Sequence, residues 1–85
     1  MWTAEIIASE DDKFIHMQIY TRGSTLEEAQ SSVEFVTGCI VKYGSVHWRK
    51  EPKASSQVNF ETGVAEHQGY ARFSLERGAV DGAQA

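Results

Sequence analysis

The chain has 85 residues, the length of one domain, which leaves room for a single thin hydrophobic core. It carries 8 Lys and Arg against 12 Asp and Glu, and this formal net charge of -4 argues against a general nucleic-acid coat, which would neutralise phosphates. The single cysteine, Cys39, leaves no internal disulfide, and no apolar run approaches the roughly 18 residues of a membrane span. We therefore expect a cytoplasmic protein with no membrane contact, in the host cytoplasm if the gene is viral.

The charges are unevenly distributed along the sequence. In the first 40 residues only Lys13 and Arg22 oppose a set of acidic residues: Glu5, Glu10, Asp11, Asp12, Glu27, Glu28 and Glu34. A basic stretch then follows, in which Glu51 alone opposes Lys42, Arg49, Lys50 and Lys53. This pattern predicts a dipolar molecule that is steered toward a charged protein partner.

The first two predicted elements are strands over residues 2–9 and 14–21, joined by a short acidic turn as in a β-hairpin. Alternation predicts that Trp2, Ala4, Ile6 and Ala8 of the first strand face inward. In the second strand it places Ile15, Met17 and Ile19 on one face and Phe14, His16, Gln18 and Tyr20 on the other.

The period then changes to that of a helix, up to Gly44. The predicted inner stripe is Leu26, Ala29, Val33, Val36 and Ile40. Either Ser24 with Glu27, or Thr25 with Glu28, supplies a capping box at its start.

Four residues near the end of this helix carry further predictions. Lys42 lies in the last turn and Gly44 stops the helix. Gly38 in mid-helix permits the close approach of the sheet or of another chain. Cys39 is expected to be a small buried hydrophobe that does not react in the folded state.

The second half of the chain predicts three strands. Residues 45–50 form one, with Val46 and Trp48 inward; Pro52 ends it, and residues 51–56 are a loop. Residues 57–62 form the next, with Val58 and Phe60 inward. A turn at Gly63 leads into residues 64–76, where Ala71, Phe73 and Leu75 face inward and Gly69 marks a bulge.

The predicted order β-β-α-β-β-β gives a two-layer α+β fold, a single antiparallel sheet with one helix packed on one face. Residues 1–77 form this single domain, and residues 78–85 form a disordered C-terminal tail. Because one helix covers only one face of the sheet, the other face meets water or a partner.

The uncovered face is the first candidate for a functional site. It is expected to combine aromatic, histidine and arginine side chains, which are enriched at binding hot spots. The predicted partner-binding residues are Phe14, His16, Gln18, Tyr20, His47, Arg49, Tyr70 and Arg72. The alternative interpretation is a face stabilised by cross-strand aromatic pairs, with no partner.

A second candidate surface is acidic and consists of Glu10, Asp11, Asp12, Glu27, Glu28 and Glu34. Small acidic single domains are common among phage-encoded inhibitors of host machinery, including anti-CRISPR proteins, and this analogy of size and charge alone suggests an inhibitor that occludes a host protein. The function predicted is thus protein–protein interaction, either with another protein or with a second copy in a homodimer. Binding of single-stranded RNA by the aromatic sheet face is the less favoured alternative, because the net charge has the wrong sign.

No catalytic residues, metal site or cofactor are predicted, and we do not expect an enzyme. The spacing of His16, His47 and His67 matches no zinc pattern, and the acidic turn lacks the spaced ligands of a calcium loop.

Overall fold

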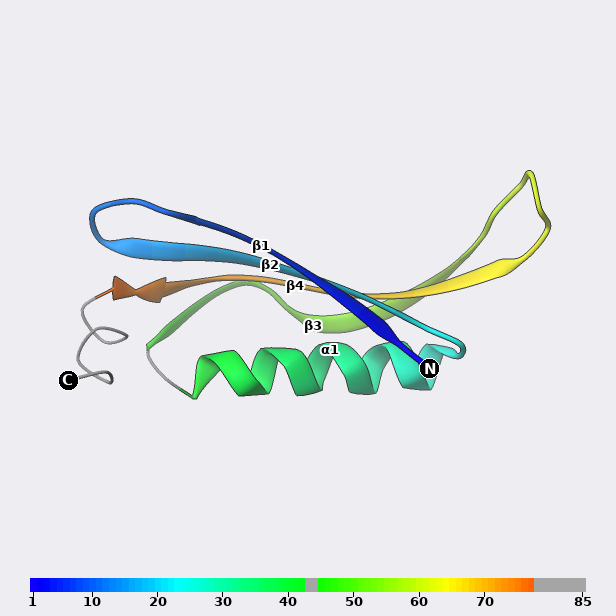
Figure 1. Ribbon diagram of the computed structural model, residues 1–85, viewed down its shortest axis with the longest axis horizontal. Coiled ribbons are helices and arrows are strands. Elements are labelled where there is room, and N and C mark those ends of the chain that lie inside the picture. Colours follow the sequence, from blue (N-terminus) through cyan, green and yellow to red (C-terminus); the bar gives the residue numbers. More distant parts are fainter. Residues whose placement is uncertain (43–44, 78–85) are drawn as a thin grey trace.

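The computed structural model describes residues 1–42 and 45–77, which form a four-stranded antiparallel sheet with one helix on one face (Figure 1). Along the chain the elements are β1 (Thr3–Glu10), β2 (Phe14–Gly23), α1 (Leu26–Val41), β3 (Val46–Val58) and β4 (Ala65–Glu76). The strands lie in the order β1-β2-β4-β3, so that β1 and β3 are the two edges of the sheet. The predicted two-layer α+β class is confirmed. The predicted C-terminal tail and the Gly44 stop lie outside the described residues.

The hairpin between β1 and β2 is held by its acidic turn. Asp11 Oδ1 accepts hydrogen bonds from the backbone N–H groups of Lys13 (2.9 Å) and Phe14 (2.8 Å), and the Asp11 N–H donates to the Phe14 carbonyl (2.9 Å). Beyond the turn the two strands pair without a register shift, from Glu10 opposite Ile15 to Thr3 opposite Arg22. An aspartate that caps a turn in this way is a common local device, because its short side chain reaches the backbone N–H groups that follow.

The helix begins with the second of the two predicted capping pairs. Thr25 is the N-cap, and its hydroxyl accepts from the Glu28 N–H at 3.0 Å. Glu28 Oε1 in turn accepts from the Ser24 N–H at 2.7 Å. This hydrogen bond lowers the pKa of Glu28, and the nearby N-terminal ammonium lowers it further. Lys42 forms the C-cap, one residue beyond the helix.

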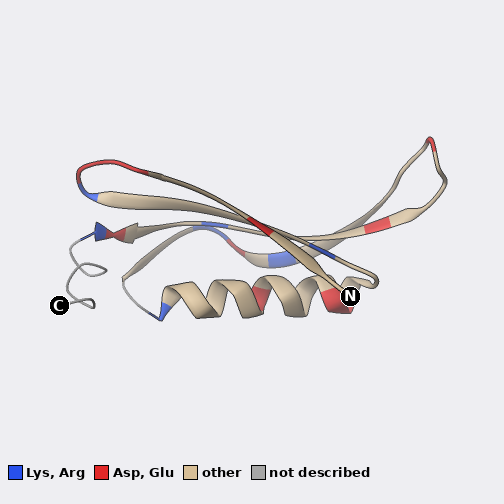
Figure 2. Cartoon of the chain, in the orientation of Figure 1, with Lys and Arg blue, Asp and Glu red and all other residues tan. Residues whose placement is uncertain are grey.

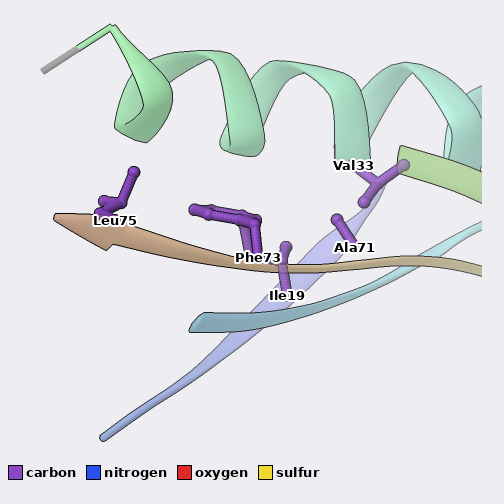
Figure 3. Close-up of a cluster of buried hydrophobic side chains, with 5 residues drawn as sticks. All are labelled: Ile19, Val33, Ala71, Phe73 and Leu75. Carbon is purple, nitrogen blue, oxygen red and sulfur yellow. The ribbon is translucent and has the colours of Figure 1, made fainter. Parts of the chain in front are cut away.

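The hydrophobic core lies between α1 and the inner face of the sheet (Figure 3). Its buried members are Ile19 of β2, Val33 of α1, and Ala71, Phe73 and Leu75 of β4. Burial of such side chains contributes roughly 1.5–3 kcal/mol each for the larger ones, so this cluster supplies most of the apolar stabilisation of a small domain.

The predicted helix stripe is correct at Ala29 and Val33, which are buried, and at Val36 and Ile40, which pack against the core. It is wrong at Leu26, which is 46% exposed. Because helical side chains lean toward the N-terminus, Leu26 in the first helical position points past the end of the packed layer.

The predictions for Gly38 and Gly69 are both wrong, because the close approach expected at Gly38 occurs at Gly69 instead. A Cβ at Gly38 would have no atom within 4 Å, so Gly38 allows no close approach. A Cβ at Gly69 would collide with the Thr21 hydroxyl and lie 2.6 Å from Val33 Cβ and 2.7 Å from the Ala29 carbonyl oxygen. Gly69 is therefore not a bulge but a point where α1 lies close against the sheet.

Cys39 was predicted to be buried and is exposed. It directly follows the exposed Gly38, on the side of α1 that faces away from the sheet. The expectation that its thiol is shielded in the folded state is therefore wrong.

The second half of the sheet has one strand fewer than predicted, because β3 runs through Pro52 without ending. A proline is tolerated on an edge strand, where its missing N–H need not join the ladder. Pro52 also lies between Lys50 and Lys53, where the register of β3 against β4 shifts. The irregular pairing of these two strands is therefore in β3 and not at Gly69, where it was predicted.

The predicted inward position of Phe60 is wrong, whereas Val58, opposite Ala65, lies on the helix side of the sheet as predicted but is not covered there. The continuous β3–β4 hairpin extends past α1 (Figure 1), and the helix does not cover its distal end. Phe60 lies in the turn and is 98% exposed, and Val58 is also exposed. Gly63, with φ of 72°, forms the turn as predicted.

The helix packs on β2, β3 and β4 and leaves most of β1 bare. Register places Ala4, Ile6 and Ala8 on the helix side of the sheet, as predicted, but all three are exposed. Trp2 is tethered there by an edge-on contact with Phe35 of α1, with ring centroids 6.1 Å apart.

Candidate functional site: the open face of the sheet

The side of the sheet opposite α1, the open face, brings the predicted partner-binding residues together. Across β2 and β4, the facing pairs are His16 with Ser74, Gln18 with Arg72, and Tyr20 with Tyr70. Phe14 lies opposite Glu76 on the same face, and on β3 His47 is also opposite Ser74. Arg49 lies where the register of β3 shifts, and it lines the same hollow as His16 and Arg72. All eight residues therefore share one face, and their role in binding remains a prediction.

The open face is hollowed along its length. The best-defined depression, about 270 Å³, is lined by polar side chains of His16, Gln18, Arg49, Arg72 and Ser74, with Ile7 and Ser9 of β1 at its rim. A neighbouring hollow of about 200 Å³ lies between Phe14 and His47. Toward the other end, Glu5, Tyr20 and Arg22 line a third of about 330 Å³. These are shallow sites of the size that a partner's side chains fill.

Aromatic rings stand in pairs at the two ends of this face. The Tyr20 and Tyr70 rings lie 4.9 Å apart, and both hydroxyls donate to Gln18 Oε1, at 2.9 and 3.4 Å. At the other end, Phe14 meets His47 edge-on at 5.5 Å. Because cross-strand aromatic pairs hold each other in place, they present rigid rings that lose little freedom on binding.

The open face also gathers most of the cations of the chain, including three that the sequence analysis did not assign to it. Five of the eight Lys and Arg lie there by register or lining: Arg22, Arg49, Lys50, Lys53 and Arg72. Within residues 1–42 and 45–77, no carboxylate lies within ion-pair distance of any of the five. The carboxylates that share the face by register are Glu5, Glu66 and Glu76. The face is thus positive on a protein whose net charge is negative.

The reasons why Arg22, Lys50 and Lys53 were not predicted to lie on the open face can be identified. Arg22 has the same alternation as Phe14 to Tyr20 and is one step further along β2, so extending the period would have found it. Lys50 and Lys53 were assigned to an edge or loop because Pro52 was expected to end the strand. The shifts in register turn them onto the open face, opposite Arg72 and Tyr70.

His16 is held between two partners at the end of this face nearest the β1–β2 turn. Its Nε2 lies 2.9 Å from Asp11 Oδ2, and its Nδ1 lies 2.7 Å from Ser74 Oγ. Because the Asp11 carboxylate only accepts, Nε2 carries a proton, and a neutral ring then accepts the Ser74 hydroxyl at Nδ1. The bond to His16, together with the N–H groups of Lys13 and Phe14, lowers the pKa of Asp11 from 3.8 to about 2.

This chain of Asp, His and Ser has the connectivity of a nucleophile relay, but two observations favour a structural role. Ser74 is only 6% exposed and lies on β4, an inner strand of the sheet. Ser56 and His67, which face each other across β3 and β4, make the same kind of contact at 2.6 Å. Ser–His pairing across neighbouring strands is thus a repeated way of fixing side chains in this sheet.

The predicted acidic surface is divided into separate groups, one at the β1–β2 turn at one end of the molecule and one on α1 (Figure 2). Glu10, Asp11 and Asp12 lie at the β1–β2 turn, whereas Glu27 and Glu28 lie at the start of α1. Several of these carboxylates are engaged in the fold: Glu10 pairs with Arg77 at 3.5 Å, and Glu34 accepts from Gln30 at 3.2 Å. They do not form one continuous acidic patch.

Among the described residues, no three His, Cys, Asp or Glu side chains gather as ligands for a metal ion. In that same part of the chain, no helix has the length and apolar character needed to cross a membrane. Comparisons with protein-family models, with curated proteins and with solved structures give no significant match. Function is therefore inferred from the open face.

Proposed function

We propose that this protein is a stand-alone binding module that covers an acidic, partly aromatic surface of another protein with its open face. The observation that carries the proposal is the concentration of five cations there, none of which forms an ion pair with a carboxylate of the described residues. Like charges gathered on one face repel each other, and an anionic partner removes this cost.

The aromatic pairs support a protein partner. Tyr, Trp and Arg dominate interface hot spots because they combine a large contact area with directed hydrogen bonds. Here Tyr20 and Tyr70 flank the hollow that Arg49 and Arg72 line, so one partner segment can place an aromatic ring and a carboxylate side by side.

A module of this kind acts by occlusion, because it blocks whatever else the covered surface binds. An inhibitor of a host protein, of the phage type, is the form of this function that small size and acidity suggest by analogy. We place its action in the cytoplasm, where a lone cysteine stays reduced.

Single-stranded RNA is the second candidate. The favouring observation is the same juxtaposition of rings and guanidinium groups, since bases stack on aromatic side chains while cations hold the phosphates. The positive open face weakens the objection from net charge, but the carboxylates Glu5, Glu66 and Glu76 lie on the same face.

The test measures fluorescence anisotropy with three labelled probes: an acidic peptide containing tyrosine, the same peptide with amides replacing its carboxylates, and an oligouridylate of equal charge. We expect the acidic peptide to bind best. Tyr20→Ala combined with Arg49→Ala should weaken it by about 2 kcal/mol or more, roughly thirtyfold in Kd. The melting temperature should change little, because both side chains are exposed.

The matched control is Phe60→Ala combined with Lys13→Ala, which removes one aromatic ring and one cation from exposed positions elsewhere. It should bind like the parent. An equal loss of affinity in both double variants would show that only the total charge of the protein matters, and it would rule out the open face as the binding site. Stronger binding of the oligouridylate, falling steeply with salt, would favour the RNA candidate. If Glu27→Lys combined with Glu34→Lys loses peptide binding, while Tyr20→Ala combined with Arg49→Ala keeps it, the binding site lies on the helix layer.

A further inference from the structure

The two edges of the sheet are built very differently. On β3 the register shifts twice, Pro52 interrupts the row of N–H groups, and charged Arg49, Lys50, Glu51 and Lys53 stand in sequence. Bulges, proline and lysine are the devices by which proteins keep an edge strand from pairing with another chain. The β1 edge has none of them, since all eight residues from Thr3 to Glu10 pair regularly with β2 and include neither Pro nor Lys.

The outer side of β1 also exposes apolar side chains. Ile6 on the helix side is 49% exposed, and Ile7 on the open face is 46% exposed. Because α1 packs mainly on the other three strands, it leaves about half of Ile6 uncovered. An unprotected, regular and apolar edge of this kind is a template for a further strand.

The free hydrogen-bonding groups of β1 can be assigned from the hairpin. The Asp11 N–H donates to the Phe14 carbonyl, so this pair is hydrogen-bonded, and antiparallel pairs alternate from there along the ladder. The peptide groups of Thr3, Glu5, Ile7 and Ser9 therefore point toward β2. Those of Ala4, Ile6 and Ala8 point outward.

We propose that the β1 edge pairs antiparallel with the β1 edge of a second copy of this chain, around a two-fold axis at Ile6. In this register Ile6 lies opposite itself, Ala4 opposite Ala8, and Thr3 opposite Ser9, so side chains of similar size meet. On the open face Glu5 lies opposite Ile7, and no like charges meet. An axis at Ile7 would also pair Ile7 with itself and Ile6 with Ala8, but it would set Ala4 against Glu10 and Thr3 against Asp11, so its outer pairs match less well.

The resulting dimer has one continuous eight-stranded sheet whose open faces join. Ile7 and Ser9 line the rim of the Arg49–Arg72 hollow, so the second copy adds Glu5 beside that rim and takes part in the proposed binding site. The dimer stands independently of the proposed function, since it uses the edge of the sheet and not its face.

The first experiment measures molar mass by sedimentation equilibrium up to sub-millimolar concentration. We expect twice the 9.5-kDa chain mass for the parent protein and for Arg49→Ala, and a single chain mass for Ile6→Lys, which sets two ammonium groups against each other on the axis. Circular dichroism checks that Ile6→Lys stays folded. A parent protein that sediments as one chain throughout would overturn the proposal.

The second experiment tests the register and does not depend on a destabilising substitution. In a Cys39→Ser background, Ile6→Cys should oxidise to a disulfide-linked dimer, because the two thiols meet on the axis. Ile7→Cys, at the next residue and equally exposed, should not, because each thiol would lie opposite Glu5. Preferential cross-linking through Ile7→Cys would exclude the axis at Ile6. If Ile6→Lys loses the dimer but still binds the acidic peptide as a monomer, the β1-edge dimer and the open-face binding site are independent of each other.

Discussion

The two faces of the sheet are made by alternate residues of the same strands, but they are built from different kinds of side chain. On β4, Ala71, Phe73 and Leu75 point to the helix and are buried, whereas Tyr70 and Arg72 point to the open face. The helix-covered face is small, apolar and tightly fitted. The open face is aromatic and cationic, and little of it is needed to hold the fold. Stability and binding can therefore be altered separately in this domain.

The largest effect is expected on the covered face. Val33→Asp places a charge in a fully buried position with no cationic partner, which a domain of this size does not tolerate. We expect an unfolded circular dichroism spectrum. Val36→Asp should be milder, because Val36 is only partly buried.

Ser31→Asp, two residues earlier on the exposed side of α1, adds the same charge and is the matched control. It should melt within a few degrees of the parent. A folded Val33→Asp with the melting temperature of Ser31→Asp would mean that α1 is packed through a different side.

A smaller effect is expected from the two glycines of the helix–sheet layer. Gly69→Ala forces a methyl group against Val33 and the Ala29 carbonyl, and overpacking of this kind costs about 1–3 kcal/mol. Gly38→Ala meets no atom within 4 Å and should stabilise the exposed helix by up to about 1 kcal/mol. Urea unfolding of both variants checks the opposite signs. Equal changes would contradict the close approach at Gly69.

Much of this contrast between the faces was predictable from local sequence pattern. Alternation on β2 assigned Phe14, His16, Gln18 and Tyr20 to one face and Ile15, Met17 and Ile19 to the other, because the side-chain period of a strand is two. The helical period likewise identified Val33 as core. Both signals depend only on the spacing of residues along the chain, so a single sequence is enough to recognise them.

The features that were missed depend on where elements lie in space. Pro52 ends a central strand but not an edge strand, and the sequence does not state which strand is the edge. Leu26 was assigned by periodicity, but its exposure depends on how far the sheet extends beneath α1. Cys39 was expected to be buried beside Ile40, but it lies on the side of α1 that faces away from the sheet. The cationic character of the open face emerged only when the shifts in β3 turned Lys50 and Lys53 toward Arg72 and Tyr70.

The smallest expected effect tests the turn that anchors His16 at the edge of the open face. The folded pKa of Asp11 is about 2, below the ordinary 3.8 that applies to the unfolded chain. The carboxylate therefore stabilises the fold at every pH above about 4, and this contribution is lost as the pH falls through about 2, because the unfolded chain takes up the proton first. Asp11→Asn, which cannot ionise, should remove this part of the pH dependence.

The measurement is the free energy of unfolding in urea between pH 6 and pH 2, as a difference between parent and variant. This difference should be largest near neutral pH and shrink as the solution is acidified through the window between 3.8 and about 2. Asp12→Asn removes a carboxylate from the same turn but none of the hydrogen bonds to Lys13, Phe14 and His16, so it should follow the parent. A constant difference between the parent and Asp11→Asn would show that His16 is held by Ser74 alone, and the open face would then be less firmly fixed at this end than at the tyrosine pair.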